Sequence, residues 1–254
     1  MDTLNSFTGL VRRCVDDYRM IGRDDRILVG VSGGKDSLVL LMALHHLRSF
    51  YPLPFHLEAV TVDAGFPGMD FGPVEELCRG LELPYTILKT DIREIVFDIR
   101  QEDNPCSLCS KMRRGALNNF VRDHGFNKLA LGHHFDDAVE TFLMSLLFEG
   151  RLSCFKPVTY MSRSGVTQIR PLLYAGEKRV ANLCESLALP VVTSTCPQDK
   201  TSHRQEIKDL LTALSRQYPD LRSKVFGAMQ RLPLDGWGPT PHERVKTRER
   251  EKEE

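Results

Sequence analysis

Short β-rich segments alternate with longer helical segments along much of this chain, and this alternation constrains its fold more than any other feature. The apolar and β-branched runs cover residues 26–31, 57–62, 85–88 and 128–131, and the segments with helical spacing cover 37–48, 74–81, 111–124 and 137–148. Strands joined through helices pair in parallel, because each helix returns the chain to the same end of the sheet. The sequence therefore predicts an α/β fold, with a doubly wound, mainly parallel sheet and helices on both faces.

The chain is less regular after Gly150. The pattern there predicts strands at 167–170 and 190–194, a helix at 177–186, and two helices within 201–231 that are separated by Tyr218-Pro219. The segment 91–110 lacks periodicity, so we expect a loop that closes over a site.

One domain accounts for this pattern. We expect residues 1–231 to form it, with a helix at the N-terminus and a helical extension at the C-terminus. Residues 232–254 end in the run KTREREKEE, which has too little apolar content to fold, so we expect a disordered charged tail.

Charge and cysteine content narrow the class of protein. The 34 Lys and Arg residues balance 34 Asp and Glu residues, which excludes a strongly basic nucleic-acid protein but leaves a local basic face open. The chain has no run of 18 apolar residues and no secretory signal pattern at its start, so we expect a cytoplasmic protein without membrane association. Seven cysteines in a reducing compartment indicate buried thiols together with a metal or redox set.

A phosphate-binding turn follows the first predicted strand. Paired glycines allow the backbone to approach a ligand, and the N–H groups of the following helix suit a phosphate. Serine hydroxyls and a lysine add donors, and the aspartate can cap the helix or hold Mg²⁺. The residues of this turn are Ser32, Gly33, Gly34, Lys35, Asp36 and Ser37. The spacing matches neither the usual nucleotide triphosphatase loop nor a dinucleotide-binding turn.

The sequence SGGKDS in this position resembles the loop of the PP-loop, or N-type ATP pyrophosphatase, superfamily. The resemblance implies an adenine nucleotide alpha hydrolase-like fold. It also implies that this loop binds the pyrophosphate of ATP, and that a substrate oxygen attacks the α-phosphate to give an adenylated intermediate. Lys35 and Asp36 would then have catalytic roles.

A second polar turn, Gly132-His133-His134-Phe135-Asp136-Asp137, follows another predicted strand and faces the same edge of the sheet. Imidazole and carboxylate groups together suit a divalent metal, but an aspartate that caps the helix is an alternative. The resemblance favours a nucleotide-binding and Mg²⁺-supporting role for Gly132, His133 and Asp137. Asp63, at the end of the second strand, is either an adenosine or Mg²⁺ contact or a turn residue.

Cys106 and Cys109 form the only C-x-x-C pair, and two thiolates at this spacing can share a metal or a cluster or form a redox pair. Cys196 follows a predicted strand, where a ligand could point into a site. We expect the remaining cysteines to be buried in helical apolar patterns; these are Cys14, Cys78, Cys154 and Cys184.

Three motifs narrow the resemblance: PCSLCSKMRRGAL, LGHHFDDAVETFLMSLLFEGRL and RPLLYAGEK. Together they are similar to the tRNA 2-thiocytidine synthetases, over about residues 5–231 in this chain. The resemblance implies ATP-dependent replacement of O2 of cytidine-32, in the tRNA anticodon loop, by sulfur. It also implies a [4Fe-4S] cluster on Cys106, Cys109 and Cys196, with one iron left to hold sulfide and with the C-x-x-C thiols in catalytic roles.

The region around Cys196 departs from the family pattern, since members often read Cys-x-x-Cys-Gly-Ser-Gln where this chain has TSTCPQ. A zinc ion on the same thiols and a persulfide mechanism remain alternatives to the cluster. Thiolation of a uridine or a small molecule, and a non-catalytic iron–sulfur sensor, remain alternative functions.

The expected partners are tRNA, a sulfur donor such as a cysteine desulfurase or sulfide, and a second copy of the chain. Lys111, Arg113 and Arg114, which follow the C-x-x-C pair, would contact tRNA phosphates.

Overall fold

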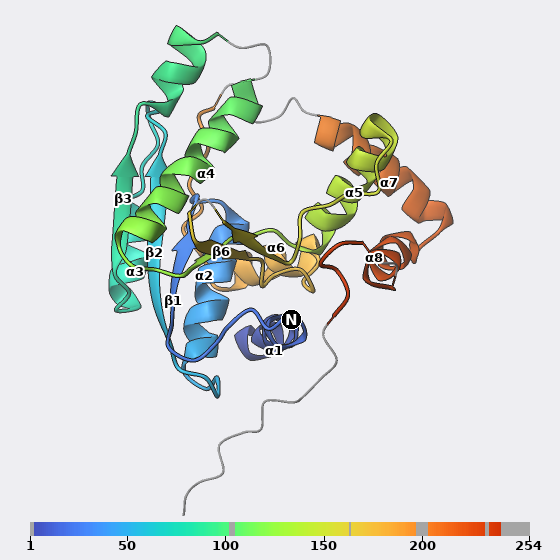
Figure 1. Cartoon of the computed structure of the whole chain (residues 1–254), viewed down its shortest axis with the longest axis horizontal. Coiled ribbons are helices and arrows are strands. Elements are labelled where there is room, and N and C mark those ends of the chain that lie inside the picture. The colour runs from blue at the N-terminus through green and yellow to red at the C-terminus, as the bar shows by residue number, and fades with distance from the viewer. Residues whose placement is uncertain (1–2, 102–104, 163, 197–202, 232–233, 240–254) are drawn as a thin grey trace, which may run out of the picture.

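The computed structural model describes residues 3–101, 105–162, 164–196, 203–231 and 234–239. Within these residues lies a six-stranded sheet in the order β3-β2-β1-β4-β6-β5 (Figure 1). Neighbouring strands are parallel except for β5, which is antiparallel to β6 at one edge. The prediction of a mainly parallel sheet is therefore confirmed. The strands are β1 Asp25–Gly30, β2 Phe55–Asp63, β3 Tyr85–Lys89, β4 Lys128–Ala130, β5 Val158–Met161 and β6 Val166–Ile169.

Helices cover both faces of the sheet. They are α1 Leu4–Asp17, α2 Lys35–Arg48, α3 Gly72–Gly80, α4 Pro105–Asp123, α5 Phe135–Glu149, α6 Glu177–Ser186, α7 His203–Gln217 and α8 Leu221–Arg231. Alternate residues of a strand point to opposite faces, so Ile27 and Val29 of β1 pack with α1 and α2 in the main core. Leu28, between them, packs on the other face with Val121 of α4.

Two predicted segments differ from the structure. The pattern predicts a strand at 190–194, but these residues run as an extended chain outside the sheet, because Val192 N–H bonds Gly33 O in a loop instead of a neighbouring strand. The segment 91–110, for which the sequence predicts a loop, contains a π-helix, η1 (Glu94–Ile99), and the first turns of α4. The buried side chain of Val96 anchors η1 in an apolar cluster.

The C-terminal helices α7 and α8 pack against α5, and Ile207 and Leu211 of α7 are buried in the main core. The predicted tail begins too early: Trp237 is fully buried, and its Nε1 donates to Phe155 O at 3.1 Å. An indole with a hydrogen-bond partner is well suited to burial, so the segment around Trp237 belongs to the folded part. Residues 232–233 and 240–254 of that tail lie outside the described residues. In the described part, no helix is long and apolar enough to cross a membrane.

Candidate active site

The site lies where the strand order reverses. β1 is the first strand of the chain yet lies between β2 and β4, so the loops that leave β1 and β4 meet at one edge of the sheet. Crevices at such reversals are the usual ligand sites of open α/β sheets. A Cβ on Gly132 would lie 3.1 Å from Asp36 C and from Ser37 N. Glycine at position 132 therefore lets the two predicted loops touch.

The phosphate turn has the geometry of an anion cradle. Gly33 adopts a φ of 84°, which favours glycine, and Gly34 caps α2 without a side-chain hydrogen bond. Ser37 Oγ donates to Gly34 O at 2.9 Å and accepts from Ser32 N at 3.1 Å, which fixes the turn. The first N–H groups of α2 thus have no side-chain cap and are suited to receive a phosphate.

Lys35 and Asp36 form an ion pair at the start of α2. Lys35 Nζ lies 2.9 Å from Asp36 Oδ1 and 3.4 Å from Glu177 Oε1. Burial lowers the pKa of Lys35, but the hydrogen bond and charge of Asp36, with those of Glu177, outweigh this effect and raise it. Lys35 is therefore a cation at neutral pH.

The second turn places His134, rather than His133, against the phosphate loop. His134 caps α5 in a capping box with Asp137, and its Nε2 lies 3.7 Å from Asp36 Oδ1 and 3.5 Å from Asp137 Oδ2. Arg204 Nη1 of α7 donates to Asp137 Oδ1 at 2.8 Å. Asp36 and Asp137, predicted from separate motifs, thus flank one imidazole.

His133 packs against an aromatic side chain. Its ring lies 4.8 Å from that of Phe155, and its Nδ1 is buried with no hydrogen-bond partner among the described residues. Burial, then the charge of Arg170, lowers the pKa of His133 to about 4, so the ring is neutral at physiological pH. Its predicted nucleotide contact would therefore be uncharged.

Asp63 ends β2 at the same edge of the sheet. Its Oδ1 accepts from Gly65 N at 2.9 Å, as in a turn that an aspartate stabilises. This is the turn role that the sequence offers as one of two alternatives; the predicted adenosine or Mg²⁺ contact remains a prediction.

Sequence reasoning missed most of the charged residues that surround the two loops; of those that follow, only Asp136 belongs to one of the predicted turns. Asp136 Oδ2 accepts from Glu177 N at 2.7 Å, and its Oδ1 accepts from Arg222 Nη1 of α8 at 2.9 Å. Lys208 Nζ of α7 donates to both carboxylate oxygens of Glu177 at 3.2 Å. Glu177, Lys208 and Arg222 lie far from both loops in the chain and together form no local motif, so only the fold reveals them.

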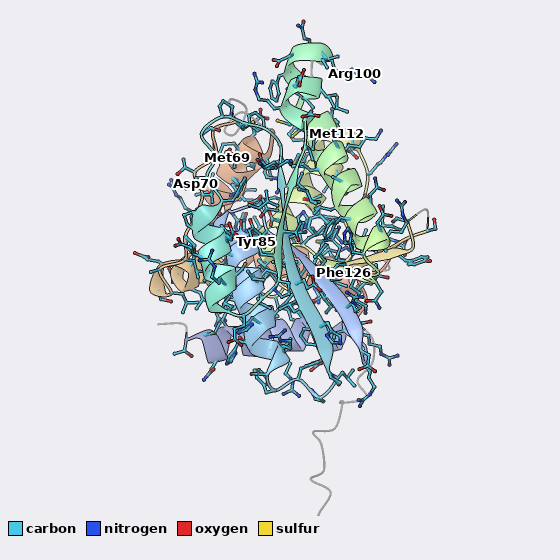
Figure 2. The ribbon with its side chains drawn as sticks, turned by 90° about the vertical axis from the view of Figure 1, so that its left-hand side faces the viewer. Met69, Asp70, Tyr85, Arg100, Met112 and Phe126 are labelled. Atoms are coloured by element: carbon cyan, nitrogen blue, oxygen red, sulfur yellow. The ribbon has the colours of Figure 1, made fainter. Side chains whose placement is uncertain are left out.

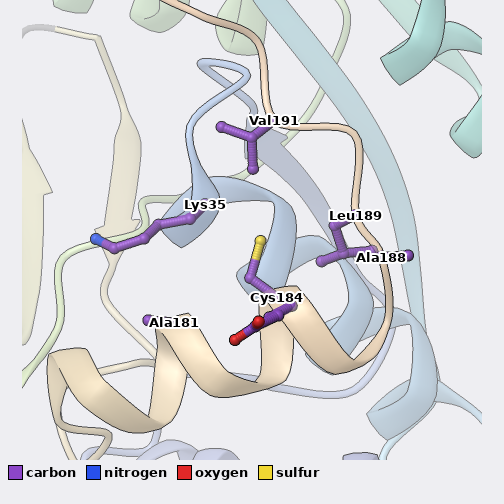
Figure 3. A pocket seen from close by; sticks show the side chains of 7 residues that line it. Lys35, Ala181, Cys184, Ala188, Leu189 and Val191 are labelled. Carbon is purple, nitrogen blue, oxygen red and sulfur yellow. The ribbon is translucent and has the colours of Figure 1, made fainter.

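A pocket of about 500 Å³ borders the phosphate loop (Figure 3). Lys35 lines one side, and Cys184 of α6 faces the same space. The rest of the lining is mostly apolar and comes from α6 and the segment after it: Ala181, Glu185, Ala188, Leu189 and Val191.

Two of the three predicted cluster ligands, Cys109 and Cys196, pack in one apolar cluster with Met69 and Met112, which are labelled near the upper end of the sheet in Figure 2. Cys106 and Cys109 are one turn apart on α4; Cys106 is exposed and Cys109 is buried. Cys196 packs against the apolar cluster that contains Cys109, here named the cysteine-side cluster: Ala64, Phe66, Ile92, Val96 and Cys109. In the part of the chain that the structure describes, no three or more His, Cys, Asp or Glu side chains are grouped closely enough to hold a metal.

The segment 189–196 joins this cluster to the phosphate loop. Val192 N donates to Gly33 O at 2.9 Å, and a Cβ on Gly33 would lie 2.8 Å from Val192 Cβ. Thr195 Oγ1 donates to Pro67 O at 3.0 Å, beside the cysteine-side cluster. The same short segment therefore contacts the phosphate loop at Val192 and reaches the cysteine-side cluster at Cys196.

A phosphate cradle at the reversal point of a parallel sheet, built from SGGKDS, defines a PP-loop domain. The family described as "PP-loop domain" matches residues 10–214. The NcsA U34-tRNA thiolase from Methanococcus maripaludis, solved with its [4Fe-4S] cluster, superposes with a TM-score of 0.74 and 26% identity, over 90% of this chain and 79% of that one.

Curated relatives narrow the class. A protein of Pelobacter propionicus, named tRNA-cytidine(32) 2-sulfurtransferase, is 39% identical over 225 residues, which cover 87% of this chain and 84% of the relative. A protein of the same name from Syntrophotalea carbinolica is 38% identical, over 87% and 86%. The chain belongs to the tRNA-cytidine(32) 2-sulfurtransferase family of PP-loop proteins.

Proposed function

We propose that the chain is an ATP-dependent tRNA thiolase that converts cytidine-32 to 2-thiocytidine. The observation that carries this proposal is the segment 189–196, which bonds to the phosphate loop at Gly33 and places Cys196 on the cysteine-side cluster. An adenylating site and a sulfur-handling site must lie close together, because the first acts on O2 of the base and the second on C2, the carbon bonded to it.

ATP would bind along the edge where the two loops meet. The turn from Ser32 to Ser37 holds the phosphates through its N–H groups and through Lys35. Asp36 and Asp137 supply the carboxylate oxygens that Mg²⁺ prefers. Gly132 allows the close contact between the loops, and we retain Asp63 and His133 as nucleotide contacts.

The reaction replaces one atom of the base. The cytidine O2 attacks the α-phosphorus of ATP, and the bond from that phosphorus to pyrophosphate breaks. The adenylated O2 is then a good leaving group. A sulfur nucleophile adds at C2, the C2–O2 bond breaks, and AMP departs with the oxygen. The chain's own contribution is to bind the pyrophosphate and to orient the base toward ATP.

The thiols of Cys106, Cys109 and Cys196 fit a [4Fe-4S] cluster in their chemistry, since thiolates are its usual ligands. Cys109 and Cys196 share the cysteine-side cluster, whereas Cys106 is exposed one turn away on α4. The three are not grouped closely enough to hold a metal in the described part of the structure, so the support comes from the thiols and not from their distances. With three thiolates for four irons, the cluster would supply a sulfide on the iron that has no protein ligand. The apolar residues beside Cys109 and Cys196 would limit access of water from that side.

The proposal also covers how the enzyme would hold tRNA, where its sulfur would come from, and its assembly. The substrate would be held through Lys111, Arg113 and Arg114 of α4, and sulfur would come from a cysteine desulfurase or free sulfide. The enzyme would work in the cytoplasm as a homodimer, with residues 1–231 and the segment around Trp237 as its folded unit.

Nucleoside mass spectrometry of tRNA from source cells with and without the gene tests the reaction. Selective loss of 2-thiocytidine is expected. Loss of a thiouridine would assign the chain to the chemistry named for the NcsA thiolase, and an unchanged nucleoside profile would exclude tRNA as the substrate.

Cysteine variants test the sulfur site. Cys106→Ala, Cys109→Ala and Cys196→Ala should each reduce bound iron and abolish thiolation, because each removes a thiolate ligand. Cys78→Ala, in α3 and remote from the site, should retain both. Iron analysis and visible absorption after anaerobic reconstitution measure the first effect. Unchanged iron content in all three variants would refute the cluster assignment.

A further inference from the structure

Two lysines from distant parts of the chain share one carboxylate at the edge of the phosphate loop. Glu177 Oε1 accepts from Lys35 Nζ at 3.4 Å and from Lys208 Nζ at 3.2 Å, and Glu177 Oε2 accepts from Lys208 at 3.2 Å. A single oxygen atom thus joins a cation of the phosphate loop to a cation of the C-terminal extension. A phosphoryl group, which is larger and carries more charge, can take the place of that carboxylate.

The position of Lys208 is fixed by packing. Ile207 and Leu211 of α7 are buried in the main core, which sets the rotation of the helix. Arg204, one turn before Lys208, also faces the site and contacts Asp137. α7 therefore presents two cations, four residues apart, to carboxylates that border the predicted ATP site.

Glu177 remains a carboxylate when no ligand is bound. Burial raises the pKa of Glu177, but the hydrogen bond and charge of Lys208, together with the charge of Lys35, outweigh this effect and lower it. The side chains of Lys208 and Glu177 are 32% and 37% exposed, so a soluble anion can reach them. Exposed ion pairs of this kind contribute little to stability.

We infer that Lys208 is a second phosphate-binding residue, which moves from Glu177 to the β- and γ-phosphates of ATP and stabilises the departing pyrophosphate together with Lys35. This inference rests on the proposed ATP-dependent function and adds a residue that the loop motif does not contain. Pyrophosphate carries several negative charges, and a second lysine would offset part of them as the bond to the α-phosphorus breaks.

Calorimetric titration of the full chain with MgATP, inorganic pyrophosphate and AMP tests the role of Lys208. Lys208→Ala should weaken binding of ATP and pyrophosphate by about tenfold or more and leave binding of AMP unchanged, since AMP lacks the phosphates concerned. Lys208→Arg should recover part of the affinity. Lys224→Ala, which removes an exposed lysine from α8, is the matched control and should bind all three like the wild type.

Glu177→Gln distinguishes phosphate binding by Lys208 from a purely structural role, in which its ion pair with Glu177 only holds α7 against α6. If Lys208 only holds the helices together, Glu177→Gln and Lys208→Ala should weaken pyrophosphate binding equally. If Lys208 binds phosphate, Glu177→Gln keeps the cation and should retain pyrophosphate affinity. Equal losses in both variants, or unchanged affinity in Lys208→Ala, would overturn the inference alone. Failure of the wild type to bind ATP would overturn the proposed function as well.

Discussion

Single residues of the site divide into those that a motif indicates and those that only the fold brings near. The loop from Ser32 to Ser37 is evident from sequence, because two glycines, two serines and a lysine follow a strand directly. The motif by itself does not distinguish the roles of His133 and His134. The signal that separates them is the spacing of three residues from His134 to Asp137, which is that of a capping box.

Glu140 is a further residue that no motif indicates. It lies on α5, is fully buried, and has neither carboxylate oxygen hydrogen-bonded within the described residues. Arg222 Nη1 lies 4.0 Å from its Oε1. Burial raises the pKa of Glu140 to about 7, an effect that the charges of Lys208 and Arg204 offset only in part.

This raised pKa predicts a pH-dependent stability. The folded state holds a proton on Glu140 that the unfolded state has released above pH 4.5, so its contribution is complete below that pH and is lost as the pH rises through about 7. His133 acts in the opposite direction, because its lowered pKa makes folding less favourable as the pH falls below 6.5.

Comparison of the wild type with Glu140→Gln separates the effect of the Glu140 carboxyl group on stability from the effect of His133. The stability of the variant relative to the wild type should rise by about 3 kcal/mol between pH 5 and pH 8, as measured by urea unfolding. Glu185→Gln, at an exposed position on α6, should show no such change. A constant difference between Glu140→Gln and the wild type across this range would contradict the prediction.

At the scale of elements, β1, β2, β3 and β4 and the helices between them are predictable. In this part of the chain the spacing of apolar residues and the positions of the glycine turns indicate the same element boundaries. The segment 190–194 is not predictable, because its valines resemble a strand but bond to the phosphate loop and not to a sheet neighbour. Edge strand β5 also escapes prediction; it is four residues long, and Tyr160 within it is exposed.

The contact between the loops after β1 and β4 can be tested at Gly132. Gly132→Ala would place a methyl group 3.1 Å from the backbone of Asp36 and Ser37, and backbone cannot move aside as a side chain can. We expect a loss of stability of about 1–3 kcal/mol and weaker ATP binding, because the phosphate turn is displaced.

Gly9→Ala is the matched control for this change. Gly9 is exposed on α1, and a methyl group there would meet nothing within 4 Å, so alanine should stabilise the helix by up to about 1 kcal/mol without changing ATP affinity. Thermal unfolding and ATP titration measure both variants. If Gly132→Ala bound ATP with wild-type affinity, ATP binding would not depend on the close contact between the two loops.

At the scale of the whole molecule, the segment after α8 completes the main core. Trp237 packs against Phe226 with ring centroids 5.4 Å apart and bonds to Phe155, whose ring contacts His133. Composition predicts that the chain beyond residue 231 does not fold. A single tryptophan among glycines and prolines is too weak a pattern to predict otherwise, since its partners lie far away in the sequence.

Two truncations test this part of the core. A chain that ends at residue 231 should lose about 3–5 kcal/mol of stability, because it lacks the buried indole. A chain that ends at Pro239 keeps Trp237 and should unfold like the full chain. Urea unfolding followed by circular dichroism compares the two, and equal stability would show that Trp237 is dispensable.

The hydrogen bond from Tyr18 Oη to Trp237 O spans 219 positions of sequence. During synthesis, α1 leaves the ribosome long before this partner, because Trp237 is made 219 residues after Tyr18. Until then the aromatic surface that Trp237 covers, formed by Phe155 and Phe226, is open to water and to chaperones. A nascent chain can therefore pair its parallel strands first, whereas the aromatic side chains next to His133 are covered only after Trp237 has been synthesised.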